Sequence, residues 1–342
     1  MKHTVVLIPG DGIGPEVAES VRRVFEAAEA PVEWLERYAG TAAIERGHDS
    51  VLPKETVDAI LEHKVALKGP CTTPIGGGFG SVNVALRKNL DLFGAVRPVR
   101  SLDGVKTRYE GVDLVIVREN TEGLYAGIEN MITDGIITSL KVVTRDACKR
   151  IARFAFEFAV KHRRKKVTVL HKANIMKLGD GLFIRCAKEI HDKEFPGIIY
   201  EEQIIDAACM RLVQDPQKFD VLLCENLYGD IISDLCAGLV GGLGCVPGAN
   251  YGKNGAVFEA VHGSAPDIAG MNLANPLALL TSGVVMLRHL AEVHADVACT
   301  KAADRIKNAY NDALLKGERT RDLGGTLGTR EFTDALVKRI RG

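Results

Sequence analysis

Short apolar runs alternate with longer amphipathic stretches along most of the chain. Several apolar runs are predicted to form strands: TVVLIPG near the start, then VALKGP, VDLVIVREN, KVTVLHK, DVLLCENL and AVFEAVHG. Helical periodicity predicts helices over 15–30, 54–63, 146–161, 179–194, 230–240, 276–293 and 296–315. Some of the strands are apolar throughout, which is typical of strands covered on both faces. The alternation therefore predicts an α/β fold with a substantial parallel sheet.

Polar residues gather directly after these strands, in the segments 118–125, 171–174, 226–234 and 262–267. In open α/β sheets, ligands bind beside the carboxyl ends of the strands. The sequence therefore predicts one cleft that is lined by several strand ends. At 342 residues, the chain is long enough to form two domains.

The composition is that of an ordinary globular protein, with 46% apolar and 26% charged residues. The 44 Lys and Arg residues balance the 44 Asp and Glu residues, so no overall field favours nucleic acid or an anionic membrane. No apolar run reaches membrane-spanning length. Neither nucleic acid nor a membrane is therefore expected as a partner.

The eight cysteines are scattered, with no CxxC pair and no zinc-like spacing to histidine. We expect free, mostly buried thiols in a reducing compartment. A strand begins almost at the first residue, which leaves no room for a signal or transit peptide. A cytoplasmic location is therefore expected.

The segment PGDGIGPE at 9–16 follows the first predicted strand and begins a helix. Its three glycines fit the start of a dinucleotide fingerprint, but Pro15 stands where the next fingerprint glycine belongs. A tight strand-to-helix turn explains these glycines as well as cofactor contact does. A second glycine-rich stretch, 76–80, is interpreted as backbone freedom before a helix rather than as a phosphate cradle.

Asp230 and Asp234 lie one helical turn apart in NLYGDIISDL, so both carboxylates share one face of the predicted helix. Like charges at that spacing repel, and a divalent cation would relieve the repulsion. Oxygen ligands with no nearby His or Cys favour Mg²⁺ or Mn²⁺ over zinc. A solvated acidic face explains the pair equally well from these residues alone.

Other single residues are ambiguous when each is taken alone. Arg118 and Tyr125 fit an anion clamp and an acid, but also a loop ion pair and a partly buried ring. Lys172 ends a predicted strand and fits proton transfer, although most lysines are simply solvated. Asp206 fits a helix cap or a ligand. Asp267 fits a ribose-binding acid or an ordinary surface loop.

The order and spacing of these segments indicate a family where no single segment does. From end to end, the sequence resembles the β-decarboxylating dehydrogenases, which include isocitrate, homoisocitrate, 3-isopropylmalate and tartrate dehydrogenases. The matching motifs are GDGIGPE, SVNVALRKNLDL with AVRP, RENTEGLYAGIE, HKANIM, NLYGDIISDLCAGLVGGLG and HGSAPDIAG. The likeness is to compact NAD-dependent isocitrate dehydrogenases, including the catalytic subunit of the mitochondrial enzyme.

The resemblance implies a non-Rossmann α/β fold of two domains, with the active site in the cleft between them. The large cofactor-binding domain would comprise 1–98 and 241–342, and the small domain, which carries the dimer contact, would comprise 99–240. In relatives, the residues that match Lys172 and Asp206 enter the site of the neighbouring subunit. The resemblance therefore implies a homodimer at least, with sites shared between subunits.

The resemblance also implies the roles of individual residues. Substrate carboxylates would bind three arginines, Arg87, Arg97 and Arg118, and the divalent metal would bind three aspartates, Asp206, Asp230 and Asp234. The nicotinamide would lie near Thr72. The adenine side of the nucleotide would contact one loop and its neighbour: His262, Gly263, Ala265, Asp267, Ile268 and Asn275.

The chemistry that the resemblance implies begins with removal of the substrate hydroxyl proton by Lys172 coupled to Asp206. Hydride transfer to the nicotinamide and loss of carbon dioxide would follow. Tyr125 would then reprotonate C3.

Ser81 and Asn83 match the positions that face the variable group of the substrate in this family. Isopropylmalate enzymes carry apolar residues there, whereas both residues are polar here. Ser81 fits a helix N-cap, and Asn83 shares a helix face with Arg87. Together they suit the γ-carboxylate of isocitrate, which is costly to bury unpaired. The predicted reaction is conversion of isocitrate to 2-oxoglutarate and carbon dioxide in the tricarboxylic acid cycle, with homoisocitrate, tartrate or 3-isopropylmalate as alternative substrates.

Asp267 followed by Ile268 resembles the NAD-dependent pattern, since NADP-dependent relatives often carry Lys and Tyr there. The predicted cofactors are therefore NAD and Mg²⁺ or Mn²⁺. The alternative of a different class is a non-catalytic regulatory subunit of a hetero-oligomeric isocitrate dehydrogenase. Such paralogues lose catalytic residues, whereas this chain retains the tyrosine, the lysine, the three aspartates and the three arginines named above.

Overall fold

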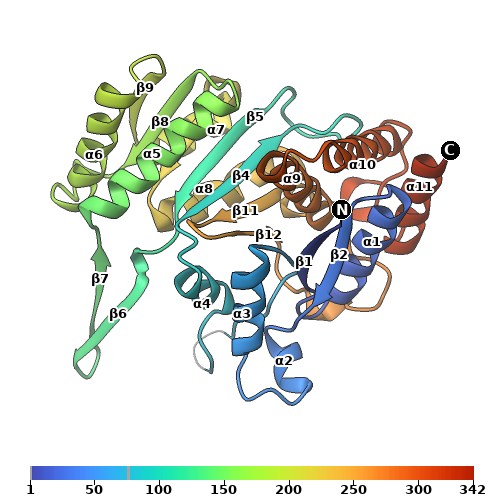
Figure 1. The fold of residues 1–342 in the computed structure, drawn as a ribbon. Coiled ribbons are helices and arrows are strands. Elements are labelled where there is room, and N and C mark those ends of the chain that lie inside the picture. Colours follow the sequence, from blue (N-terminus) through green and yellow to red (C-terminus); the bar gives the residue numbers. More distant parts are fainter. Residues whose placement is uncertain (1, 75–77) are drawn as a thin grey trace. The chain divides into compact units, whose positions relative to one another are not determined.

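The computed structural model describes residues 2–74 and 78–342, and it divides the chain into two compact units. The first unit comprises Met1–Leu90, Ser101–Arg108 and Val240–Gly342, and the second comprises Asp91–Arg100 and Tyr109–Leu239. Each unit contains helices and mainly parallel strands, so the predicted α/β fold class is confirmed (Figure 1).

The strands of the first unit are β1 (His3–Ile8), β2 (Val32–Glu36), β3 (Val65–Lys68), β11 (Pro247–Tyr251) and β12 (Ala256–Ala260). Its helices are α1 (Gly14–Ala27), α2 (Thr41–Glu45), α3 (Lys54–His63), α4 (Val82–Asn89), α9 (Leu277–His294), α10 (Val297–Leu315) and α11 (Thr329–Arg341). The strands lie in the order β2-β1-β3-β12-β11, and neighbours pair in parallel except for the antiparallel pair β12 and β11.

The sheet strands of the second unit are β4 (Gly94–Arg100), β5 (Asp113–Glu119), β8 (Lys166–His171), β9 (Ile199–Ile204) and β10 (Val221–Cys224). Its helices are α5 (Arg145–Lys161), α6 (Gly179–Glu194), α7 (Ile205–Gln214) and α8 (Asn226–Leu239). The order is β4-β5-β10-β8-β9, in which only β4 runs antiparallel to its neighbour. A separate antiparallel hairpin, β6 (Gly123–Thr133) with β7 (Ile136–Val142), projects from this unit (Figure 1).

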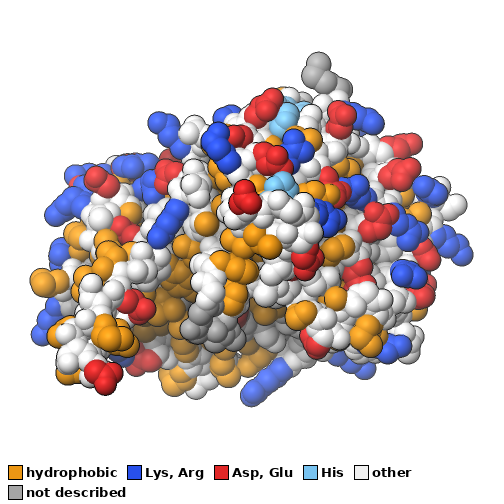
Figure 2. All heavy atoms as spheres, turned by 90° about the horizontal axis from the view of Figure 1, so that it is seen from below, with side chains coloured by type: hydrophobic (Ala, Val, Ile, Leu, Met, Phe, Trp, Pro, Cys, Tyr) orange, Lys and Arg blue, Asp and Glu red, His pale blue; other side chains and the backbone are white. Residues whose placement is uncertain are grey.

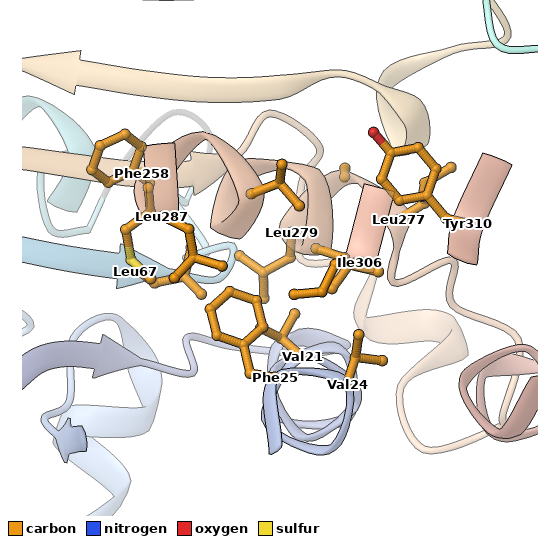
Figure 3. Packing of buried hydrophobic residues seen from close by; sticks show 14 of the residues in the cluster. Val21, Val24, Phe25, Leu67, Phe258, Leu277, Leu279, Leu287, Ile306 and Tyr310 are labelled. Atoms are coloured by element: carbon orange, nitrogen blue, oxygen red, sulfur yellow. The ribbon is translucent and has the colours of Figure 1, made fainter. Parts of the chain in front are cut away.

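The core of the first unit lies where α1, α9 and α10 pack against the sheet. Figure 3 shows side chains from these helices and from β3 and β12 converging on one another: Val21, Val24, Phe25, Leu67, Phe258, Leu277, Leu279, Leu287, Ile306 and Tyr310. The apolar positions of α1 recur every three to four residues, which is why this helix buries one face. This packing supports the loops that follow β1, β3 and β12.

Most predicted elements are present, with shifts at their ends. Helix α3 has the predicted bounds 54–63, whereas α8 begins at Asn226 rather than at 230. The earlier start follows from Glu225, whose carboxylate accepts the N–H groups of Leu227 and Tyr228 at 3.3 and 3.0 Å. The strands β2, β4, β9 and β11 and the β6–β7 hairpin were not among the predicted strands.

The boundary between the units differs from the predicted one. Residues 91–98 were expected to belong with the chain ends, but they belong to the second unit. The reason is that β4 pairs with β5 along its whole length, from Gly94 opposite Glu119 to Arg100 opposite Asp113. Conversely, residues 101–108 were expected in the small domain, but they belong to the first unit.

The surface and the cysteines agree with the composition. Lys and Arg side chains are interspersed with Asp and Glu on the face shown in Figure 2. All eight cysteines are free, and all but Cys71 and Cys209 are buried, as predicted. Among the described residues, no helix combines the length and the apolar character needed to cross a bilayer.

Candidate active site

The glycine turn between β1 and α1 packs directly against the backbone of two other loops. The Ile13 N–H donates to the Ser264 carbonyl at 2.8 Å, and the Asp11 N–H donates to the Pro70 carbonyl at 2.7 Å. Gly10 and Gly12 have φ of +83° and +57°, and a Cβ at either would lie 2.1 or 2.0 Å from one of those carbonyl oxygens. These contacts require glycine whether or not a nucleotide binds, which supports the tight-turn interpretation.

Asp11 ties the loops of the first unit together. Asp11 is 4% exposed, and its carboxylate accepts the N–H groups of Thr41, Ala42 and Thr72 at 3.1, 2.8 and 2.7 Å. The Thr72 hydroxyl also lies 2.8 Å from the Ser264 hydroxyl. The residue predicted to lie near the nicotinamide therefore contacts the loop predicted to hold the adenine side. No role was predicted for Asp11, and Ser264 was predicted only as part of the motif HGSAPDIAG.

The loop after β12 combines an unusual backbone with partly exposed polar groups. Ala265 has φ of +37°, in the region that favours glycine. Burial lowers the pKa of His262, whose Nδ1 lies 2.9 Å from the Gly263 carbonyl and whose buried Nε2 has no hydrogen-bond partner within the described chain. Asp267 is exposed in the short 3-10 helix Pro266–Ile268. This loop offers backbone and side-chain polar groups to a ligand.

Asn275 is held by the protein itself, beside that loop. Its amide Nδ2 donates to Asp322 Oδ2 at 2.9 Å, and its Oδ1 accepts the Leu277 N–H at 3.0 Å at the start of α9. Asp322 was not predicted as a site residue, and no pattern in the sequence links it to Asn275.

Helix α4 presents Ser81, Asn83 and Arg87 as predicted, while part of the glycine-rich stretch before it, residues 75–77, lies outside the described residues. The Ser81 hydroxyl caps the helix by accepting the Val84 N–H at 3.4 Å. Asn83 Oδ1 is buried without a hydrogen-bond partner within the described chain. Arg87 is 7% exposed. A buried amide oxygen and a buried guanidinium thus share this short helix.

Arg87 belongs to a buried ionic network that the sequence interpretation missed. Lys68 and Glu259 stand opposite each other on β3 and β12, with Lys68 Nζ 2.9 Å from Glu259 Oε2. Asn250 donates to Glu259 Oε1 at 2.8 Å, and Arg87 Nη2 lies 3.5 Å from the same oxygen. Burial opposes the charge of Lys68, but Glu259 outweighs it, so the pKa of Lys68 is raised. The sequence did contain a signal for this network, because a charged residue stands inside each of two apolar predicted strands: Lys68 in VALKGP and Glu259 in AVFEAVHG.

Arg118, at the end of β5, is the centre of the polar cluster in the second unit. It is 1% exposed, and its Nε and Nη2 donate to Asn226 Oδ1 at 3.1 and 2.8 Å. Its Nη1 pairs with Asp230 Oδ1, and its guanidinium lies 5.0 Å from the centre of the Tyr125 ring. The Tyr125 hydroxyl donates to the other oxygen of Asp230. The structure therefore brings three predicted residues together, and it adds Asn226.

The two carboxylates of α8 lie in a mixed electrostatic field. Although Asp234 reaches solvent, partial burial of its carboxyl and the neighbouring Asp230 raise its pKa, against the opposing effect of Arg97 and Arg118. Burial and the hydrogen bond to Asp230 raise the pKa of Tyr125, so the phenol is protonated at neutral pH. Two crowded carboxylates with only oxygen donors fit Mg²⁺ or Mn²⁺.

Lys172 and Asp206 form a second pair in this unit. Lys172 Nζ lies 2.6 Å from Asp206 Oδ1, and this hydrogen bond is the main cause of the lowered pKa of Asp206. Asp206 lies in the first turn of α7 and is exposed. The N-cap residue of α7 is Ile204 and no side chain caps the helix, so the helix-cap interpretation of Asp206 is wrong. The hydrogen bond from Lys172 keeps the Asp206 carboxylate ionised near neutral pH.

Gly229 provides the space for Arg118 on α8, which gives a direct prediction. A Cβ at Gly229 would lie 2.5 Å from Arg118 Cγ, so Gly229→Ala must displace the arginine or the helix. We expect a loss of about 1–3 kcal/mol in the free energy of unfolding, together with impaired activity. Thermal unfolding and steady-state kinetics measure both effects.

Gly238 is the matched control on the same helix, because nothing lies within 4 Å of a Cβ built there. Gly238→Ala should leave activity unchanged and stabilise the helix by up to about 1 kcal/mol. Equal behaviour of the two alanine variants would contradict the role given to Gly229.

The fold and these clusters define a class of protein: an α/β enzyme with buried arginines beside a pair of carboxylates on one helix. Residues 4–336 match the family model described as isocitrate/isopropylmalate dehydrogenase. The chain belongs to the isocitrate/isopropylmalate dehydrogenase family, as the motifs had predicted.

The chain is similar to curated and structurally characterised members of this family. It is 53% identical over 339 residues to isocitrate dehydrogenase [NAD] catalytic subunit 5, mitochondrial, of Arabidopsis thaliana, with 98% of this chain and 88% of that protein covered. It is 55% identical over 313 residues to the chloroplastic 3-isopropylmalate dehydrogenase of Solanum tuberosum, with 91% and 85% covered. The crystal structure of isocitrate dehydrogenase from Methylococcus capsulatus matches with a TM-score of 0.94 and 47% identity, covering 99% of this chain and 100% of that one.

The expected cytoplasmic location is wrong. The NAD-dependent isocitrate dehydrogenase subunits to which the chain is similar are named as mitochondrial proteins. The error has a physical reason: free thiols indicate a reducing environment but do not distinguish one reducing compartment from another.

Proposed function

We propose that this chain is a catalytic NAD-dependent dehydrogenase that oxidises and decarboxylates isocitrate to 2-oxoglutarate and carbon dioxide in the tricarboxylic acid cycle. The observation that carries the proposal is the burial of three arginines, Arg87, Arg97 and Arg118, at 7%, 3% and 1% exposure. Buried guanidinium groups are suited to bidentate binding of carboxylates, and isocitrate has three of them. The identity of about half to a named catalytic subunit supports the same reaction.

We infer the substrate from individual residues, because overall sequence identity does not distinguish isocitrate from 3-isopropylmalate. The chain is as similar to a 3-isopropylmalate dehydrogenase as to an isocitrate dehydrogenase subunit. Ser81 and Asn83 are polar where an isopropyl group would need an apolar wall. Arg87 on the same helix adds a positive charge, so α4 suits the γ-carboxylate of isocitrate.

Asp230 and Asp234 would hold a divalent cation together with Asp206 of the partner subunit. Mg²⁺ and Mn²⁺ fit these oxygen donors best, and either would supply Lewis-acid stabilisation of negative charge on the substrate oxygens. Arg97 and Arg118 offset the charge of the two α8 carboxylates. Chelation of the metal with EDTA should therefore abolish turnover, and added Mg²⁺ or Mn²⁺ should restore it.

Proton transfer would use two side chains, Lys172 to remove a proton and Tyr125 to return one to carbon. Lys172, hydrogen-bonded to Asp206, would accept the proton of the substrate hydroxyl. Tyr125 is protonated at neutral pH and points its hydroxyl at Asp230, so it can donate a proton to C3 after carbon dioxide is lost. NAD would accept the hydride.

The nucleotide would bind Thr72 and the loop after β12, with His262, Gly263, Ala265, Asp267, Ile268 and Asn275. The exposed carboxylate of Asp267 suits the ribose hydroxyls of NAD and would repel the 2′-phosphate of NADP.

Replacing Asp267 by Lys and Ile268 by Tyr should move the cofactor preference toward NADP⁺. The exchange removes a negative charge and adds a positive one beside the 2′-position. We expect kcat/KM with NADP⁺ to rise and kcat/KM with NAD⁺ to fall, each by about tenfold, which corresponds to 1.4 kcal/mol. Unchanged preference in steady-state assays would contradict the role of Asp267.

A homodimer with shared sites is supported by the exposed apolar side chains of the β6–β7 hairpin. Met131, Ile132 and Ile137 are 71%, 65% and 62% exposed. A two-stranded hairpin is marginally stable alone, and pairing with the hairpin of a second copy would cover these residues. Sedimentation of the purified chain at low concentration tests this assembly.

The regulatory-subunit alternative deserves a direct experiment, because a regulatory subunit is also among the similar proteins. The purified chain alone is assayed for NADH formation with isocitrate, NAD⁺ and Mg²⁺. Turnover without any other subunit identifies a catalytic chain. Activity that appears only after addition of a second, catalytic subunit would refute the proposal.

A further inference from the structure

A chain of buried ionic contacts in the second unit connects the backbone of Lys172 to the start of α8. Lys141, near the end of β7, places its Nζ 2.7 Å from Asp180 Oδ1 and 3.7 Å from Glu225 Oε1. Asp180 Oδ2 accepts the backbone N–H of Lys172 at 2.7 Å. Glu225 accepts two N–H groups in the first turn of α8 at 3.3 and 3.0 Å. The mechanism proposed above uses none of these three side chains.

One cation therefore serves two buried carboxylates. Asp180 and Glu225 are 2% and 9% exposed, and Lys141 is the only lysine or arginine within salt-bridge distance of either carboxylate among the described residues. Burial raises the pKa of Glu225, the nearby Asp180 adds to this effect, and Lys141 opposes it. Nζ of Lys141 also lies 4.6 Å from the centre of the Tyr228 ring on α8. Loss of this lysine would leave two carboxylates close together with no counter-charge.

We infer that Lys141 is a positioning residue that holds both the proton-transfer segment at Lys172 and the metal-ligand helix α8. The inference rests on the proposed function. In the proposed dimer, Lys172 serves the site of the partner subunit, whereas Asp230 and Asp234 of α8 serve the site of their own subunit. A single Lys141 therefore supports one group in each of the two active sites.

Lys141→Met removes the charge and keeps much of the side-chain length. We expect kcat for isocitrate to fall about 10- to 100-fold and Mn²⁺ affinity to fall about tenfold, while the KM for NAD⁺ stays nearly constant. Lys141→Arg keeps the charge and should restore most of the activity. Lys149→Met is the matched control, because Lys149 pairs with Glu189 between α5 and α6 and forms no ion pair with Asp180 or Glu225 among the described residues.

Hybrid dimers separate this role from a general loss of stability. Differently tagged wild-type and Lys141→Met chains are co-expressed, and the mixed dimer is purified through both tags. Each active site of the hybrid combines α8 of one chain with Lys172 of the other chain. The variant chain therefore contributes Lys172 to one site and α8 to the other. If Lys141 supports both groups, both sites are impaired, and the activity falls far below half of the wild-type value.

Hybrid activity near half of wild type would overturn the inference, since it would mean that one site is intact. So would Lys141→Met kinetics and Mn²⁺ affinity equal to those of Lys149→Met. If Lys141→Met does not fold, Asp180→Asn takes its place, because it keeps the shape and the acceptor for the Lys172 N–H but removes the charge that Lys141 binds. Mn²⁺ binding is measured by calorimetry without turnover, so an inactive wild-type chain would refute the proposed function and leave this readout intact.

Discussion

Replacing Ser81 by Leu together with Asn83 by Val is expected to lower kcat/KM for isocitrate by about 1000-fold while the KM for NAD⁺ changes less than about twofold. Both substitutions lie on α4, where Asn83 Oδ1 is buried without a partner within the described chain. The double variant places two apolar side chains where the γ-carboxylate would bind. An ionised carboxylate left without hydrogen bonds is strongly disfavoured there.

Ser81→Ala is the control for this experiment. It removes the hydroxyl that caps α4 and should cost about 1 kcal/mol of stability, but it leaves Asn83 in place. Its loss of isocitrate turnover should be far smaller than that of the double variant. Steady-state kinetics with isocitrate and with 3-isopropylmalate measure the change. Unchanged isocitrate kinetics in the double variant would show that Ser81 and Asn83 do not determine substrate specificity.

Replacing Arg118 by Lys is expected to lower kcat/KM for isocitrate by about 100-fold or more. The guanidinium donates through three nitrogens at once, to Asn226 and to Asp230. A lysine ammonium is a point charge and cannot reproduce these directions while also binding a substrate carboxylate. Because Arg118 and Asn226 are both 1% exposed, the unmet acceptor of Asn226 would remain without water.

Arg153→Lys is the matched control, since Arg153 also forms a two-pronged pair, with Glu194 at 2.7 and 2.6 Å, but on the surface between α5 and α6. Exposed pairs of this kind contribute about 0–1 kcal/mol, so activity should not change. Measuring kcat/KM for both lysine variants alongside their thermal unfolding separates a site effect from a folding effect. A similar loss in both variants would argue against the role of Arg118.

Much of the fold could be predicted because local pattern and tertiary packing agree. The apolar face of α1 and the bounds of α3 follow from periodicity, since these helices bury one side against a sheet. The β6–β7 hairpin could not be predicted in this way, because Ile132 and Ile137 are exposed in the single chain and give no inside–outside alternation. The unit boundary at β4 depends on its pairing with β5, which is a long-range contact.

Part of the candidate site could also be predicted from the sequence. Arg118 and Asp230 were found because polar residues that follow apolar strands meet at strand ends, and the structure joins them directly. Asn226 and Glu225 follow the same rule and could have been included. Lys68 and Glu259 were missed because each lies inside an apolar run, where the charge is tolerated only because the other strand supplies its partner.

The glycine turn after β1 shows where a sequence motif stops being informative. Gly10 and Gly12 fit a nucleotide fingerprint, yet their lack of a side chain is required by close contact with the carbonyls of Pro70 and Ser264. The cellular compartment could not be predicted either, because the residues that build the fold do not depend on it.

In the function proposed above, α4 would specify isocitrate and the loop after β12 would specify NAD⁺. The most direct measurement is the rate of NADH or NADPH formation by the purified chain with each of four acids: isocitrate, homoisocitrate, tartrate and 3-isopropylmalate. Each acid is tested with NAD⁺ and with NADP⁺ in the presence of Mg²⁺. We expect the highest kcat/KM for isocitrate with NAD⁺. A higher kcat/KM for 3-isopropylmalate or homoisocitrate, or for NADP⁺ with any of these acids, would contradict this expectation.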